Sequence, residues 1–209
     1  MPMSAQAEEI GKALAVAYGE ARCELDARDP WQLLIAAILS ARATDHQVNK
    51  VMAVLNEHYV GPAALAGLDH RDLARVVRHL PLYRQKARAL VEAARAVLRE
   101  HHGQVPESLD GLARLPGVGR KTAAVVLGNA FGVPAIAADV HVTRIAHRLG
   151  WTAREHPREA ESALSKRFPP QHWVLLCHQL IRLGRDCCRR LKPRCERCPV
   201  ARWCERKGL

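Results

Sequence analysis

Four cysteines near the C-terminal end of the sequence have the spacing of metal ligands. They follow the pattern C-x6-C-x2-C-x5-C within 17 residues, at Cys188, Cys195, Cys198 and Cys204. Thiolates this close together, in a segment with few apolar residues, can order that segment by sharing a metal centre. Free thiols are the alternative, and the clustering argues against it. The residues alone indicate a four-thiolate centre and leave the metal open between zinc and an iron–sulfur cluster.

A lysine directly after a glycine-rich turn is the second candidate for chemistry. In LPGVGRKTA, residues 115–123, Gly117 and Gly119 permit backbone angles and close approaches that a Cβ would prevent. The amides around Val118 and Gly119 are expected to point from a helix N-terminus, which favours a phosphate, while the Val118 side chain points inward. An ordinary helix–helix turn is the alternative for such a short segment.

Lys121 could act as a nucleophile if its amine were neutral. A solvated lysine has a pKa of roughly 10.4, and burial, Arg120 and the positive end of the following helix would all lower it. A neutral amine can attack an electrophilic carbon and form a Schiff base. Asp139 follows 18 residues later and could act as the acid. The alternatives are a phosphate-contacting lysine and an aspartate that only caps the helix starting at Val140.

The elements that must position these residues are predicted to be helices. Ala and Leu dominate the 48% of apolar residues, aromatic residues reach only 4%, and no strand pattern is present. Apolar spacing and helix stop signals predict helices over residues 31–39, 46–59, 69–80, 108–115, 140–149, 159–168 and 172–183. A further helix follows the glycine-rich turn and ends near Gly132.

The clearest helix carries its apolar positions between Ala87 and Leu98 at i, i+3, i+4 spacing. Its opposite face is basic, and for most of those charges a solvated surface is an adequate interpretation. The charged positions on that face are Arg84, Lys86, Arg88, Arg95 and Arg99.

The net charge of +11 favours a polyanionic partner such as nucleic acid. The low aromatic content argues against a protein that stacks many single-stranded bases. No apolar run approaches the roughly 20 residues of a membrane span, and the first ten residues lack the features of a signal peptide. We therefore expect no membrane partner and a cytoplasmic location, where cysteines serve as metal ligands or free thiols rather than disulfides.

Together these segments resemble the endonuclease III family of base-excision repair enzymes. The cysteine pattern resembles the family's [4Fe–4S] site, with Cys188 rather than Cys187 as the first ligand. LPGVGRKTA…AADVHVTR resembles its helix-hairpin-helix and catalytic segment, which implies Lys121 as the nucleophile toward the sugar C1′ and Asp139 as the acid. The implied activity removes oxidised pyrimidines from damaged double-stranded DNA and cleaves the strand by β-elimination.

The resemblance also implies which residues contact DNA. DPWQLLIAAILSARATDHQVNKV and LPLYRQKA resemble the two loops that fill the gap left by a flipped nucleotide, which places Arg42 and Leu82 in that gap. Relatives usually carry Gln at the Arg42 position and often Asn at the Ala124 position. The remaining implied contacts are the hairpin residues Gly117, Val118 and Gly119, His141, and the basic loop residues Arg189, Arg190, Lys192 and Arg194.

The implied architecture is all-α and two-lobed. A helical barrel domain spans residues 24–133 and contains the hairpin, and residues 1–23 with 134–209 form the cluster domain. DNA is expected across the groove between them, with Lys121 and Asp139 facing it, and the protein is expected to be a monomer that joins the nucleoid through DNA.

Three other functions remain open at this point. An adenine glycosylase would lack Lys121 and continue beyond Leu209, and a mismatch-specific thymine glycosylase would carry Tyr at position 121. A non-catalytic DNA-binding module would need neither Lys121 nor Asp139.

Overall fold

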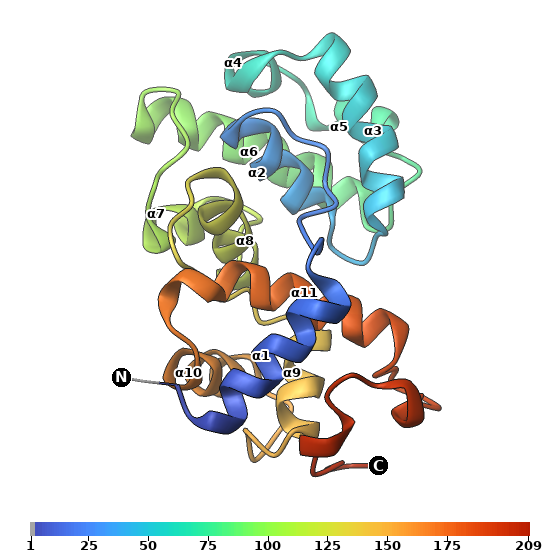
Figure 1. The fold of residues 1–209 in the computed structure, drawn as a ribbon. Helices are drawn as coiled ribbons and strands as arrows, with labels where there is room; N and C mark the ends of the chain where they lie inside the picture. Colours follow the sequence, from blue (N-terminus) through green and yellow to red (C-terminus); the bar gives the residue numbers. More distant parts are fainter. Residues whose placement is uncertain (1–2) are drawn as a thin grey trace. The chain divides into compact units, whose positions relative to one another are not determined.

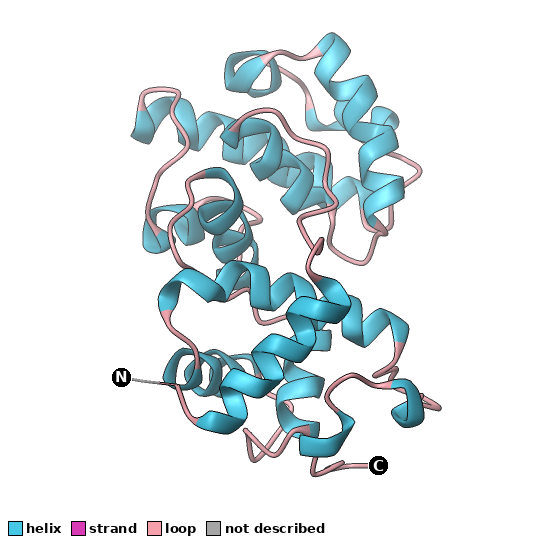
Figure 2. Cartoon of the chain, in the orientation of Figure 1, coloured by secondary structure: helices cyan, strands magenta, loops and turns pink. Residues whose placement is uncertain are grey.

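The computed structural model describes residues 3–209, and within that range the chain is helical without any strand (Figure 2), which confirms the all-α prediction. The chain divides into two compact units, residues 24–133 and residues 1–23 together with 134–209. None of the helices in the described range is long and apolar enough to cross a membrane.

The unit formed by residues 24–133 is built around one buried helix. Its helices, labelled in Figure 1, are α2 (Pro30–Leu39), α3 (Asp45–His58), α4 (Gly61–Ala66), α5 (His70–Val76), α6 (Tyr83–His101), α7 (Leu109–Arg114) and α8 (Arg120–Ala130). Eight of the ten residues of α2 are buried, because the sequence PWQLLIAAIL leaves no polar face. This helix packs against α3, α6 and α8 and so anchors the segment that carries the hairpin.

Two helices of this unit differ from the sequence prediction. The helix predicted over residues 69–80 ends at Val76, because Val77 leaves the helical region (φ −92°, ψ 12°) and the chain turns. Gly61 and Pro62, a pair predicted to stop the helix of residues 46–59, instead begin α4. Proline is well tolerated in the first turn of a helix, where its missing N–H has no partner to lose.

The basic face of α6 also contains one exception to the expected solvation. Lys86 is 4% exposed, and its Nζ has no hydrogen-bond partner among the described residues. The reason is its position, since residue 86 lies one and two turns before the buried Leu90 and Ala93 on the same helix face. Burial lowers the pKa of the Lys86 amine.

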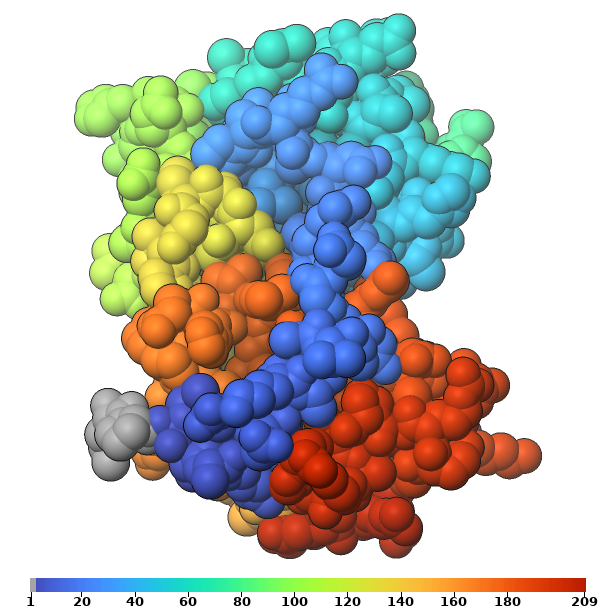
Figure 3. Space-filling view, viewed as in Figure 1, coloured from blue at the N-terminus to red at the C-terminus, as the bar shows by residue number. Residues whose placement is uncertain are grey.

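The other unit packs the start of the chain against its end. Helix α1 (Ala5–Tyr18) shares one apolar core with the later helices, and Figure 3 shows it against the C-terminal residues. These later helices are α9 (Val140–Arg148), α10 (Pro157–Arg167) and α11 (Trp173–Asp186).

The last 23 residues of this unit contain no α-helix. Residues 187–209 form two 3-10 turns, Cys195–Arg197 and Ala201–Trp203, and only Cys187 and Val200 in this segment are fully buried. A third 3-10 turn, Pro170–His172, precedes α11. Apolar packing therefore contributes little to the order of the segment that carries the four spaced cysteines.

Candidate functional site

The two glycines of the hairpin have different roles. Gly117 has φ +76°, and a Cβ added there would lie 2.6 Å from the Ala89 Cβ on α6. Both the angle and the packing therefore require glycine. Gly119 has an ordinary φ of −89°, and a Cβ added there would meet no atom within 4 Å. The backbone-angle argument is thus wrong for Gly119, where the structure instead leaves open space beside the chain.

The amides of the hairpin do not all face outward as predicted. Val118 is buried as expected, but its N–H donates to the Leu115 carbonyl at 3.0 Å and is not available to a ligand. The outward amides begin at Gly119, which caps α8 without any side-chain hydrogen bond to the first turn. This uncapped helix start keeps the positive end of the helix dipole open toward an anion.

Lys121 is the second residue of α8 and follows Arg120. Its side chain is exposed, so the expected burial is wrong for the protein without DNA. Lys121 therefore lies, with Arg120, at the positive end of the α8 dipole, where an anion is favoured.

Asp139 caps α9 in the other unit. Its Oδ1 accepts hydrogen bonds from the backbone N–H groups of His141 at 2.8 Å and Val142 at 2.9 Å. The capping alternative is therefore correct as a description of the local structure. Neither bond uses Oδ2, so capping fixes the carboxylate in place while one oxygen stays outside these bonds.

Three of the predicted DNA contacts other than glycine have left-handed backbone angles. Arg42, Leu82 and Lys192 have φ values of 55°, 59° and 50°, and only His102 and Arg206 share this feature among the non-glycine residues described. Such angles cost free energy for residues with a side chain and gather at functional positions. Leu82 is also 42% exposed, although leucine prefers burial. The two gap-filling candidates thus lie at strained, outward-facing positions within the unit of residues 24–133.

His141 is held in one orientation by Arg144, a residue that sequence reasoning missed. Arg144 Nη2 lies 3.0 Å from His141 Nδ1, and a backbone hydrogen bond to Gly184 on α11 also holds the ring. Burial lowers the pKa of His141, despite the opposing charge of Asp139. The ring is therefore fixed between α9 and α11.

Two buried arginines of α9 fix the start of the basic loop. Arg144 donates to the Cys188 carbonyl at 2.9 Å through Nε and at 2.8 Å through Nη2. Arg148 donates to the carbonyls of Arg189 at 2.7 Å and Arg190 at 3.1 Å. Both side chains are less than 5% exposed. In the sequence they look like ordinary polar positions of an amphipathic helix, so no local signal identifies them.

The basic loop closes on itself through one carbonyl. Cys187 O accepts from the N–H groups of both Arg189 and Arg194 at 2.9 Å. Lys192 is exposed on the loop, whereas Arg190 forms an exposed ion pair with Glu155 at 3.3 Å. The structure therefore presents Arg189 and Lys192 outward, with Arg194 half-buried at the base.

The four spaced cysteines influence one another electrostatically. Burial raises the pKa of the Cys198 thiol to about 11, and the nearby Cys188 and Cys204 thiols add to this rise. Burial also raises the pKa of Cys204, with contributions from Cys188 and Cys195. Among residues 3–209, however, no three His, Cys, Asp or Glu side chains already have the arrangement of a metal site.

The chemistry of this donor set fits a cationic metal centre. Arg148 Nη1 donates to Cys188 Sγ at 3.3 Å, so a guanidinium lies beside the first of the four sulfurs. Cys187 differs, because its thiol lies near Asp186 Oδ2 at 3.5 Å and the Arg197 carbonyl at 3.6 Å. Cys177 is a buried thiol, and Cys23 is partly buried.

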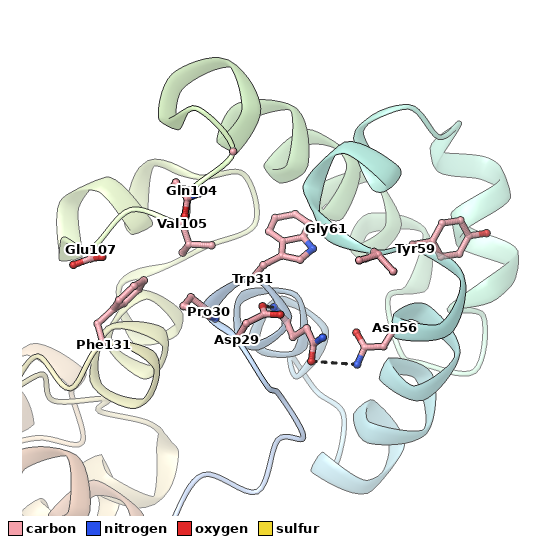
Figure 4. Close-up of a pocket in the computed structure, with 13 residues that line it drawn as sticks. Asp29, Pro30, Trp31, Asn56, Tyr59, Gly61, Gln104, Val105, Glu107 and Phe131 are labelled. Atoms are coloured by element: carbon pink, nitrogen blue, oxygen red, sulfur yellow. Dashed lines mark hydrogen bonds between the residues drawn. The ribbon is translucent and has the colours of Figure 1, made fainter.

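A cavity of about 410 Å³ lies elsewhere in the unit of residues 24–133 and is shown in Figure 4. Trp31, Tyr59 and Phe131 contribute to its lining, and none of the predicted site residues does. Phe131 follows the last residue of α8, whereas Lys121 is near the first, about 15 Å away along the helix axis. This cavity is therefore separate from the candidate reactive end of the helix.

Known proteins match the chain over nearly all of its length. Residues 35–170 match the family model of the HhH-GPD superfamily base excision DNA repair proteins. The helical fold and the hairpin therefore belong to a protein of that superfamily.

The relatives narrow this class further. Endonuclease III of Bacillus subtilis is 38% identical over 92% of this chain and 91% of its own, and that of Escherichia coli K12 is 41% identical over 88% and 87%. A solved structure of a trapped endonuclease III–DNA covalent intermediate superposes with a TM-score of 0.93 at 39% identity, covering 99% of this chain and 97% of its own. The chain belongs to the endonuclease III family.

Proposed function

We propose that Lys121 and Asp139 carry out the chemistry of this base-excision repair DNA glycosylase and AP lyase. The activity follows from membership of the endonuclease III family, and the structure of the similar DNA-bound protein supports DNA binding. The observation that carries the proposal is the position of Lys121, an exposed amine at the uncapped N-terminus of α8 directly after the hairpin.

The proposed reaction begins at the Lys121 amine. Its lone pair attacks C1′ of the damaged nucleotide, the glycosidic bond breaks and the base leaves with its bonding electrons. The sugar ring opens and the new C–N bond becomes an imine, which acidifies the C2′ proton. Loss of that proton expels the 3′ phosphate and nicks the strand, and water then releases the lysine.

Asp139 serves this reaction as a fixed carboxylate. Its two backbone hydrogen bonds hold it at the start of α9, where it accepts the proton that Lys121 must lose and stabilises the positive charge that grows on the sugar. Neither capping hydrogen bond uses Oδ2, so this oxygen is the proposed proton acceptor.

Phosphate contacts position the DNA. They come from the α8 amides that start at Gly119, from the His141 imidazole and from the outward residues of the basic loop. Arg42 and Leu82 enter the space beside a flipped nucleotide, and their strained, exposed positions support this role. The substrate class is oxidised pyrimidines in duplex DNA, and the enzyme acts as a monomer in the cytoplasm on nucleoid DNA.

The cysteines Cys188, Cys195, Cys198 and Cys204 hold a [4Fe–4S] cluster. The support is the C-x6-C-x2-C-x5-C spacing of the four cysteines and the guanidinium beside Cys188. When bound, the cluster supplies four metal–thiolate bonds that replace the missing apolar core of residues 187–209. Arg148 and Arg144 hold the first carbonyls of the basic loop in place by hydrogen bonds.

Borohydride trapping on an abasic duplex tests the nucleophile. The wild-type protein should form a permanent protein–DNA crosslink, and Lys121→Ala should lose both the crosslink and the nick while still binding the duplex. Asp139→Asn should keep DNA affinity and slow base removal by orders of magnitude. A crosslink at the wild-type level from Lys121→Ala would show that another amine is the nucleophile.

A further inference from the structure

A strongly basic groove of about 640 Å³ lies between α5 and the start of α6. Seven of its nine lining residues are arginine, histidine or tyrosine, and no carboxylate lines it. The lining comprises His70, Arg71, Ala74, Arg75, Arg78, Tyr83, Arg84, Gln85 and Arg88.

The arginines of this groove are arranged by helical spacing. Arg71, Arg75 and Arg78 follow i, i+4, i+7 spacing along α5 and the turn after it, and Arg84 and Arg88 are separated by one turn of α6. Two neighbouring helices that pack together therefore direct guanidinium groups along one groove. A buried helix face would carry apolar residues at these positions. The arginines therefore indicate a face that contacts solvent or an anionic ligand.

The carboxylates near the groove all belong to exposed pairs, of which the His70–Asp69 pair at 3.7 Å is one. Arg75 pairs with Asp72 at 2.9 Å and Arg88 with Glu92 at 2.7 Å, but both arginine side chains are at least 71% exposed. Such exposed pairs contribute little free energy, so a phosphate can replace the carboxylate without a large loss. Arg71 and Arg78 are not members of these pairs.

The groove is continuous with the Leu82 loop. Arg78 lies four residues before Leu82, and Tyr83 and Arg84 follow it directly. A duplex that receives Leu82 beside a flipped nucleotide must continue past that point, and its backbone carries a phosphate at each nucleotide. The lining offers guanidinium groups, which bind phosphate oxygens well, and includes none of the hairpin or basic-loop residues.

We propose that the α5–α6 groove binds the phosphate backbone of the duplex that flanks the lesion on the Leu82 side. The groove lengthens the DNA footprint beyond the hairpin and the basic loop, and contributes affinity without reading sequence or taking part in the reaction. The inference rests on the proposed DNA contact of Leu82.

The test compares two double variants that each remove two positive charges. Arg71→Gln/Arg78→Gln removes groove residues, and the control Arg99→Gln/Lys166→Gln removes exposed charges on the far end of α6 and on α10. Affinity for an abasic duplex is measured between low and high salt. The groove variant should lower the salt slope of log K by about 2 and weaken binding by roughly tenfold, since each phosphate contact contributes about 0.9 to the slope. The control should match the wild type.

A second experiment uses duplexes that are shortened on one side of the lesion. It shows whether the groove contacts one flank or whether any loss of positive charge weakens binding. Wild-type protein should lose affinity when one flank is shortened and not when the other is, and the groove variant should no longer distinguish the two. Equal affinities and slopes in the groove variant and the wild type would overturn the proposal, as would equal losses in the control. The single-turnover nicking rate at saturating protein should stay unchanged in the groove variant, whereas a failure of the Lys121 mechanism would appear in that rate.

Discussion

The hairpin and the basic loop are both proposed to bind phosphate, yet they are held in place by opposite means. The hairpin rests on apolar packing, with Val118 buried and Gly117 pressed against Ala89 of α6. The loop at residues 189–194 has almost no apolar support, and the guanidinium groups of Arg144 and Arg148 hold its first carbonyls.

The two regions should therefore be damaged by different kinds of substitution. Changes in shape should damage the hairpin, because a packed core tolerates little extra volume. Changes in charge, hydrogen bonding or metal content should damage the loop, because its order depends on polar tethers and on the cysteines. Each region can therefore be altered while the other is monitored.

The largest expected effect is loss of the metal centre. Cys188→Ala should give low folded yield and lose the yellow-brown colour and the absorbance near ~400 nm of an iron–sulfur protein. Cys187→Ala is the matched control and should keep both, since its thiol contacts Asp186 and the Arg197 carbonyl. Iron and sulfide analysis decides the metal, and zinc without iron would contradict the cluster.

Arg148→Met should be the next most damaging change. It removes the donors to the Arg189 and Arg190 carbonyls and to Cys188 Sγ, and hydrogen bonds from a charged group contribute about 1.5–3 kcal/mol each. We expect a loss of about 2–4 kcal/mol in unfolding free energy and weaker DNA binding. Arg154→Met, which removes an exposed ion pair with Glu159, should change stability little. Denaturant titration measures both, and equal losses would show that the tether has no special role.

The two hairpin glycines offer a matched pair for the other region. Gly117→Ala should cost about 2–4 kcal/mol, because it combines a left-handed φ with a Cβ contact of 2.6 Å. Gly119→Ala should leave stability unchanged and weaken binding to an abasic duplex, because its Cβ fills the open space where a phosphate approaches. Equal DNA affinity in Gly119→Ala and wild type would place the phosphate elsewhere.

The same contrast explains how much the sequence predicts. The all-α fold, the buried helix at residues 31–39 and the inward Val118 are all predictable, because apolar spacing and glycine report on packing within a few residues. Arg144 and Arg148 are not, since their partners lie about 40 residues away in a segment without regular structure. The sequence pattern predicts that Lys86 is solvated with the rest of the basic face. Nothing in its residue type indicates that this lysine is buried.

The strained angles are also beyond sequence reasoning. Resemblance to a family identifies Arg42 and Leu82, and nothing in their residue types indicates a positive φ. Backbone angles of this kind persist only where the surrounding structure enforces them, and they become visible only when the chain is folded. The roles of the individual site residues remain predictions that the experiments above test.

The smallest expected effect concerns the pH dependence set by His141, which links Asp139 to the tethered loop. Burial lowers the pKa of His141 in the folded protein, although Asp139 opposes this, so the unfolded chain binds the proton more readily. Stability should then fall as the pH drops through the unfolded pKa of about 6.5, and level off below the folded pKa. His141→Asn cannot titrate, and its amide oxygen can accept a hydrogen bond from Arg144. The loss of melting temperature between about pH 7.5 and about pH 5 should therefore be smaller in His141→Asn than in the wild type, while the exposed control His172→Asn should follow the wild type. An identical pH dependence in all three proteins would mean that His141 stays accessible to protons when folded, and that Arg144 holds the loop without holding the imidazole.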